Sequence, residues 1–172
     1  MKKQKINKKT VKQLLTMANK DQRLRHCAEK SNDWSRVKRE DRKHANELKK
    51  IISKYGWPTI FLVGKKASMC AWLIAQHADH DLVFQKKCLK LMEHELLKNP
   101  LSVAKQNIAY LKDRILVHLG RKQLFGTQFK RLKDGHLELS PLANKKDVDK
   151  RRKRFGMELL EEYMQMATRI KN

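Results

Sequence analysis

The chain has 172 residues, of which 40% are hydrophobic and 34% charged, with six Gly and three Pro. This length and apolar content exclude a disordered chain and are enough for one ordinary domain with a real core. The formal net charge of +23 favours nucleic acid, an anionic membrane surface or an acidic partner, although a solvated lysine-rich surface explains it equally well.

The cysteines and the apolar runs bound the class of protein further. Cys27, Cys70 and Cys88 form no Cys-x-x-Cys pair, so neither a disulfide scaffold nor a structural zinc site is predicted. The basic N-terminus has no apolar h-region after it, and the longest apolar run, 67–75, is too short to span a bilayer. A cytoplasmic location without a membrane span fits these features best.

Helical periodicity dominates the first part of the chain. Residues 1–9 are Lys-rich and are predicted to be a basic flexible tail, and apolar residues recur at helical spacing over 10–30. Ser31-Asn32-Asp33 is a helix N-cap cluster, and Tyr55-Gly56-Trp57-Pro58 predicts the end of that second helix. The charged stretch 36–44 is either a break or an exposed helix.

The middle of the chain contains the most apolar segment. Residues 67–75 leave no polar face, so a helix here is expected to be buried on all sides. Asp81 is the expected N-cap of the next helix, and Asn99-Pro100 ends it. A further helix is predicted over 102–119, with Gly120 at its end.

The last part of the chain changes character. Alternating residues on either side of Asp134-Gly135 predict a β-hairpin. The last helix is predicted to start near Asp147 and to continue through Phe155 to Met166. The sequence therefore predicts a mainly α fold: a single-domain bundle of about six helices over 10–172, with one small hairpin near 123–140.

The segment 76–81 carries the first candidate site. Gln76, His77 and Asp79 follow the apolar run directly, and polar groups at the edge of a core need partners or a function. The imidazole of His77 suits proton transfer near neutral pH, but a histidine at the end of a core helix is more often structural. The segment also holds metal-ligand residue types, but their spacing matches no recognised metal signature. Neither a metal nor a cofactor is therefore predicted.

Two charged residues interrupt the apolar faces of helix 102–119. Asp113 and Arg114 each lie beside apolar residues at helical spacing, and Arg152 falls on the apolar face of the last helix. In the functional interpretation, Asp113 orients His77 as part of the catalytic pair, and both arginines bind an anionic substrate group. In the structural interpretation, Asp113 forms a buried ion pair, for example with Arg152.

Neutral polar side chains complete the candidate set. They are expected to form hydrogen bonds with a substrate, which Asp79 also binds in this interpretation, and they are Gln76, Gln85, Gln123, Thr127 and Gln128. For the residues of 123–128 the alternative is a bulge whose side chains cap helix ends.

Several of these polar islands occur together in a pattern. They are Asp21-Gln22, Gly56-Trp57-Pro58, Gly64, Gln76-His77-Ala78-Asp79, Phe84-Gln85, Tyr110-Leu111-Lys112-Asp113-Arg114, Gln123-Leu124-Phe125-Gly126-Thr127-Gln128 and Arg151-Arg152. With them the chain resembles a widespread, largely uncharacterised bacterial domain family. The resemblance covers most of 21–156 and implies one intact domain with a shared polar site, without assigning a reaction. That family more often has Tyr at Phe125, so any role of its hydroxyl would be lost here.

Three functions are compatible with these features. The first is a small enzyme or ligand-binding protein whose His, Asp, Arg and Gln side chains act on an anionic small molecule or modified peptide by metal-independent acid–base chemistry. The second is a basic nucleic-acid-binding protein with structural polar islands and weak nonspecific binding, because no known nucleic-acid-binding motif is present. The third is an interaction module. Whether the chain is an enzyme stays open at this point.

Overall fold

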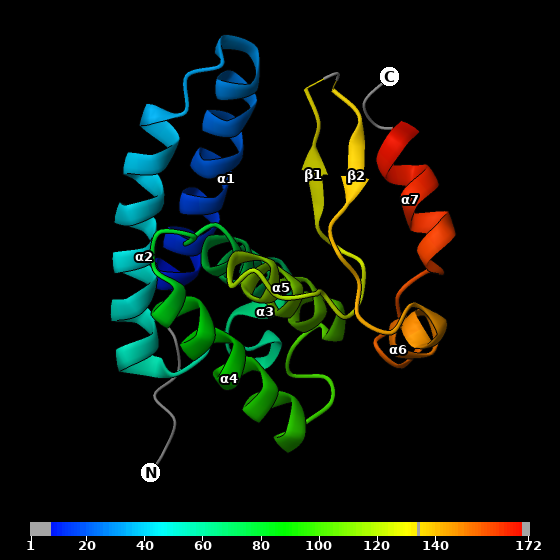
Figure 1. Cartoon of the computed structure of the whole chain (residues 1–172). Helices are drawn as coiled ribbons and strands as arrows, with labels where there is room; N and C mark the ends of the chain where they lie inside the picture. The colour runs from blue at the N-terminus through cyan, green and yellow to red at the C-terminus, as the bar shows by residue number, and fades with distance from the viewer. Residues whose placement is uncertain (1–7, 134, 170–172) are drawn as a thin grey trace. The chain divides into compact units, whose positions relative to one another are not determined.

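The computed structural model describes residues 8–133 and 135–169 and is mainly α-helical (Figure 1). The chain forms two compact units, Met1–Ala104 and Lys105–Asn172, called here the N-terminal and C-terminal units. The described residues form seven α-helices and one small hairpin, which confirms the predicted mainly α fold with a single hairpin. No helix in the described part of the chain is long and apolar enough to cross a membrane.

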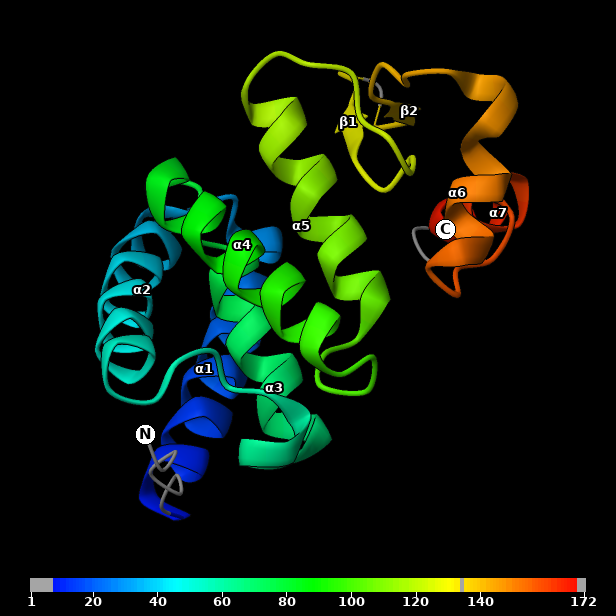
Figure 2. The same ribbon diagram turned by 90° about the horizontal axis from the view of Figure 1, so that it is seen from below.

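The N-terminal unit consists of four helices, which Figure 2 shows from below. They are α1 (Lys8–Ser31), α2 (Ser35–Tyr55), α3 (Ile60–Gln76) and α4 (Leu82–Lys98). Helix α1 packs against α2 and α3, α2 packs against α3, and α4 packs against α3. Their core includes Leu14, Ala45, Leu48, Ala71, Ala75 and Cys88, all with no exposed surface.

Local sequence signals set the helix ends in this unit. The side chain of Asp81 accepts a hydrogen bond from Phe84 N at 2.9 Å, which confirms the predicted N-cap of α4. Gly56 follows α2 with a φ of 76°, and its N–H donates to Ile52 O at 2.9 Å. A left-handed backbone at this point favours Gly, as the predicted helix end requires.

Three details of the unit differ from or refine the sequence predictions. Helix α1 already includes Lys8 and Lys9, so the predicted tail 1–9 is too long, and its residues 1–7 lie outside the described residues. Helix α2 continues without a break through 36–44, because Val37, Glu40 and His44 are buried at helical spacing. The prediction that helix 67–75 is buried on all sides is wrong, because Met69 is 58% exposed.

The C-terminal unit starts with α5 (Lys105–His118), three residues after the predicted start. The hairpin follows, with β1 (Phe129–Arg131) antiparallel to β2 (Leu137–Leu139) and Phe129 opposite Leu139. Gly135 lies in the predicted turn, and Asp134 lies outside the described residues. The alternating pattern thus located the hairpin correctly.

The single helix predicted from Asp147 onward is wrong. A short 3₁₀ turn, η1 (Lys145–Asp147), leads into α6 (Val148–Arg154), and α7 (Leu160–Arg169) is a separate helix. Gly156 has a φ of 66°, its N–H donates to Lys153 O, and Met157 N donates to Arg152 O. These two bonds form a Schellman motif, in which a left-handed glycine ends the helix.

Candidate functional site

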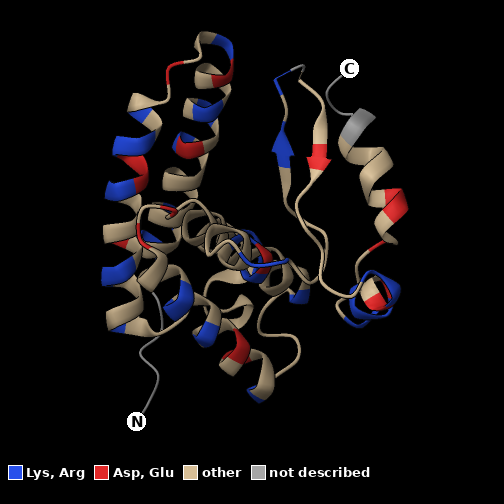
Figure 3. Ribbon diagram, viewed as in Figure 1, with Lys and Arg blue, Asp and Glu red and all other residues tan. Residues whose placement is uncertain are grey.

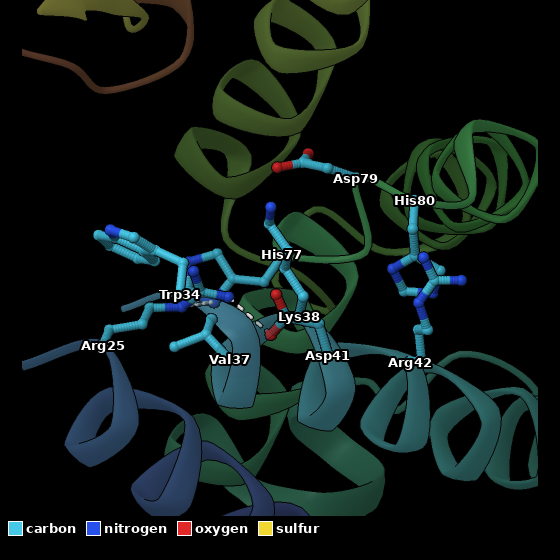
Figure 4. A pocket seen from close by; sticks show the side chains of 9 residues that line it. All are labelled: Arg25, Trp34, Val37, Lys38, Asp41, Arg42, His77, Asp79 and His80. Carbon is cyan, nitrogen blue, oxygen red and sulfur yellow. Dashed lines mark hydrogen bonds and ion pairs between the residues drawn. The ribbon is translucent and has the colours of Figure 1, made fainter. Parts of the chain in front are cut away.

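A pocket of about 570 Å³ lies in the N-terminal unit, between α1, α2 and the segment after α3 (Figure 4). Its size falls within the range of about 300–1,000 Å³ that is typical of small-molecule sites. Its lining is mostly charged or aromatic and consists of Arg25, Trp34, Val37, Lys38, Asp41, Arg42, His77, Asp79 and His80. Two predicted site residues, His77 and Asp79, therefore lie in one pocket.

His77 is held by a carboxylate from another helix. Its Nδ1 lies 2.9 Å from Oδ2 of Asp21 and 3.1 Å from Oδ1. Asp21 belongs to α1 and its side chain is 2% exposed, whereas the His77 side chain is 14% exposed. A buried carboxylate thus holds a histidine that remains accessible from the pocket.

Arg25 connects this pair to a second carboxylate. Its Nε lies 3.1 Å from Oδ1 of Asp21 and 3.0 Å from Nδ1 of His77, and its Nη2 lies 2.7 Å from Oδ1 of Asp41. Two N–H groups cannot point at each other, so Nδ1 either donates to Asp21 or accepts from Arg25. Because a carboxylate lies at 2.9 Å from Nδ1, and Arg25 Nε also has Asp21 Oδ1 as acceptor, the geometry favours the Nδ1–H tautomer.

In that tautomer the second ring nitrogen, Nε2, carries a lone pair. Among the described residues, no side chain or backbone group forms a hydrogen bond with this atom. Nε2 is therefore the imidazole atom available to a molecule in the pocket.

Burial and the charges around His77 both shift the pKa values of the two carboxylates. Burial, the largest single influence, raises the pKa of Asp21. The hydrogen bond and charge of His77 and the charge of Arg25 together outweigh burial and lower this pKa to about 2. Burial raises the pKa of Asp41, and the guanidinium of Arg25 counteracts that rise only in part. Asp21 is therefore the firmly ionised partner of His77.

The other predicted residues of this unit surround the end of α3. Gln85 is fully buried, and its Nε2 donates to Ala75 O at 3.3 Å, Gln76 O at 3.1 Å and Asp79 Oδ1 at 3.1 Å. These bonds satisfy the last carbonyls of α3 and hold the turn that contains His77 and Asp79. Gln76 is itself buried, and within the described chain its Oε1 has no hydrogen-bond partner.

Asp113 lies in the C-terminal unit and organises the segment after α5. It has no exposed surface, and its Oδ1 accepts from Leu124 N at 2.7 Å and Phe125 N at 3.1 Å. Its Oδ2 accepts from Phe125 N, Thr127 N and Thr127 Oγ1 at 3.0–3.1 Å. Burial raises the pKa of Asp113, although the backbone N–H donors lower it. These contacts supply a structural role for the residue.

The amides of the same loop hold the base of the hairpin. Gln123 Nε2 donates to Gln128 O at 2.9 Å and to Ser140 O at 2.8 Å, and Gln123 Oε1 accepts from Gln128 N at 2.9 Å. Gln128 Nε2 donates to Thr127 Oγ1 at 3.1 Å. Gly126 lies between them with a φ of 71°, and an added Cβ would meet Leu160 Cδ1 at 2.6 Å. The left-handed backbone at this position thus favours Gly, and a side chain here would also force Leu160 to shift.

Two consecutive arginines of α6 bind carbonyls of the same loop. Arg152 has no exposed surface, donates to Phe125 O and Glu158 O at 2.6 Å each, and lies over the ring of Tyr163. Arg151 donates to Leu124 O at 2.8 Å. Arg114 is half-buried on α5. The hydrogen-bond acceptors of Arg152 are backbone carbonyls, and the structure shows no ion pair between Arg152 and Asp113.

The predicted residues thus form two groups. His77, Gln76, Asp79 and Gln85 lie together at the end of α3, and Asp113, Gln123, Thr127, Gln128 and Arg152 lie together around residues 123–128. The expectation that both groups line one cleft stays a prediction.

The sequence interpretation named Asp21 only within the polar island Asp21-Gln22, without a role at the site, and it missed Arg25 and Asp41. A signal for them exists in the sequence, because Asp21 and Arg25 fall on the buried stripe of α1 between Ala18 and Ala28. Asp41 similarly falls four residues after buried Val37. Charged residues on an apolar stripe must find partners inside the fold.

Within the described chain, no group of three or more His, Cys, Asp and Glu side chains is placed to hold a metal ion.

The chain matches the model of a family of unknown function (DUF6624) over residues 8–170 and therefore belongs to that family. Neither a curated protein nor a solved structure matches the chain.

Proposed function

We propose that this protein, a member of the family of unknown function DUF6624, is a small enzyme or ligand-binding protein. Its proposed activity is acid–base chemistry on an anionic small molecule. His77 is the group that accepts and returns the proton. One observation carries this proposal: Asp21 Oδ2 lies 2.9 Å from His77 Nδ1 while His77 lines a 570 Å³ pocket.

The chemistry follows from the two ends of the imidazole. Neutral His77 donates Nδ1–H to Asp21, which fixes the ring and leaves the Nε2 lone pair toward the pocket. When Nε2 takes a proton from a substrate or a water, the positive charge that forms is stabilised by the adjacent carboxylate. Orientation of His77, for which the sequence suggested Asp113, is therefore assigned to Asp21.

Arg25 acts as a positioning residue behind this pair. It bridges Asp21 and Asp41, so both carboxylates remain in place when the charge of the imidazole changes. The anionic character of the ligand is supported by Lys38 and Arg42, whose side chains are exposed at the pocket.

Two measurements test the proposal. Long-range ¹H–¹⁵N NMR spectra identify the tautomer of neutral His77, and the Nδ1–H form is expected in the wild type. Turnover is then screened on a panel of small phosphate and carboxylate esters, comparing the wild type with His77→Gln and with His26→Gln. His26 is an exposed histidine of α1 and serves as the matched control.

The expected outcome is specific to His77. Any turnover that the screen finds is expected to fall by roughly 10²–10⁴ in His77→Gln and to stay unchanged in His26→Gln. An Nε2–H tautomer, with Arg25 donating to Nδ1, would contradict the proposal. Equal turnover in the wild type and His77→Gln would contradict it too.

A second candidate function is nucleic-acid binding through the basic surface. The net charge of +23 favours it, and Figure 3 shows Lys and Arg distributed along several helices of both units. In the run 150–154, however, Arg151 and Arg152 bind backbone carbonyls. Only Lys150, Lys153 and Arg154 of that run are exposed to a phosphate backbone.

A further inference from the structure

One wall of the pocket beside His77 carries an aromatic ring in addition to the two cations that support an anionic ligand. Trp34, the residue directly before α2, is followed at intervals of four residues by Lys38 and Arg42 of α2, and all three line the pocket. Residues four apart lie on the same helix face with Cβ atoms about 5–6 Å apart. The wall therefore presents an indole, then an ammonium, then a guanidinium in a row.

Within the described residues, the two cations of this wall have no protein partner. In the described part of the chain, neither Lys38 nor Arg42 forms an ion pair or a side-chain hydrogen bond. Some other lysines of the unit do pair with carboxylates, such as Lys20 with Glu40 and Lys49 with Asp81 at 2.7 Å each. A ligand anion between Lys38 and Arg42 would supply the missing partner.

The indole of Trp34 sets a second requirement. It lies at the start of α2, beside Val37, and both contribute apolar surface to the pocket. Trp34 is half-buried, and a flat ring stacked on its open face removes apolar area of both partners from water. The rise of 1.5 Å per residue places Trp34 about 6 Å from Lys38 and about 12 Å from Arg42 along the helix axis.

The carboxylates limit the charge that the ligand can carry. Asp79 lines the pocket, and the Asp21 carboxylate lies directly behind His77. These groups disfavour a compact polyanion that fills the pocket, and they favour a ligand with its negative charge at one end. Trp34 favours a flat ring at the other end of such a ligand. The carboxylates favour a neutral polar group between the ring and the charged end.

We propose that this pocket binds a nucleoside phosphate, with the base on Trp34 and the phosphate between Lys38 and Arg42. This inference rests on the proposed function, because it names the substrate class of the same site. The sugar then lies between the two ends, on the side of the pocket that holds Asp79 and His77. The shared chemistry is a base and a phosphate on one sugar, as in a free mononucleotide or in single-stranded RNA.

Isothermal titration calorimetry tests the two ends of the ligand separately. AMP is compared with adenosine, which lacks the phosphate, and with ribose 5-phosphate, which lacks the base. AMP is expected to bind at least about tenfold more tightly than either part, since both ends contribute to its affinity. A 5′-phosphorylated oligoadenylate in a parallel titration distinguishes RNA from free nucleotide, and whichever binds more tightly identifies the source.

Protein variants assign the binding to this wall. Lys38→Gln with Arg42→Gln is expected to weaken AMP binding at least about tenfold, and Trp34→Ala is expected to weaken it on the order of tenfold or more. Trp34→Phe retains a stacking face and is expected to lose less. The matched control is Arg36→Gln with Arg39→Gln, which removes the same charge from exposed positions of α2 outside the pocket lining.

The outcomes separate this inference from the proposed function. AMP binding no tighter than that of ribose 5-phosphate, or equal weakening in the two double variants, would overturn the nucleoside phosphate. In that case an Nδ1–H tautomer of His77 would leave the acid–base proposal standing. An Nε2–H tautomer combined with Trp34-dependent AMP binding would overturn the acid–base proposal and leave a nucleotide-binding site.

Discussion

Replacement of Asp21 by Asn removes the charge that holds His77 and Arg25. The pKa of Asp21 is about 2 in the folded protein, whereas an ordinary Asp side chain has a pKa of 3.8. Burial opposes this shift, and the contacts with His77 and Arg25 outweigh it. Each pKa unit corresponds to about 1.4 kcal/mol, so the ionised carboxylate stabilises the fold by about 2 kcal/mol at neutral pH. Its side chain is 2% exposed, so solvent screens this contribution little.

The sign of the pH dependence follows from the direction of the shift. Because the folded pKa lies below the unfolded one, the stabilisation is complete above about pH 5 and is lost as the pH falls through about 2. From pH 6.5 to pH 3 the wild type is expected to lose about 1 kcal/mol more than Asp21→Asn, which is about half of the total.

Urea unfolding followed by circular dichroism measures this difference at the two pH values. Glu29→Gln removes one exposed carboxylate from the same helix and is expected to retain the acid sensitivity of the wild type. Equal losses of unfolding free energy in the wild type and in Asp21→Asn would refute the assigned role of Asp21.

Two further outcomes are expected in the C-terminal unit. Asp113→Asn places an amide N–H₂ where the buried carboxylate accepts from Phe125 and Thr127, so we expect a loss of at least about 3 kcal/mol of unfolding free energy in urea titrations. A change below about 1 kcal/mol would show that the loop does not depend on the carboxylate. Neutralising Lys150, Lys153 and Arg154 to Gln is expected to weaken a nonspecific, salt-dependent binding of nucleic acid whose Kd is no tighter than about 10⁻⁶ M. Tight, sequence-selective binding in a fluorescence anisotropy titration at high salt would instead favour the second candidate function.

Much of the fold follows from short segments of sequence. The N-cap at Asp81, the left-handed glycine at Gly56 and the alternating runs beside the hairpin each act over a few residues. Gly156, which ends α6, is a local signal of the same kind. The apolar periodicity through Phe155 predicted one continuous helix, so this signal was not used. Such features are encoded locally because hydrogen bonds between near neighbours determine them.

The sequence also selected His77 correctly as a residue that needs a partner, but it did not reveal which one. Asp21 is 56 residues away on α1, and the sequence offered Asp113 for the same role. The periodic pattern of α1 shows which face of the helix is buried, and the same pattern fits burial against any apolar neighbour. Only the packing of α1 against α2 and α3 brings Asp21, Arg25 and Asp41 to His77, because that choice depends on the shapes of whole helix faces.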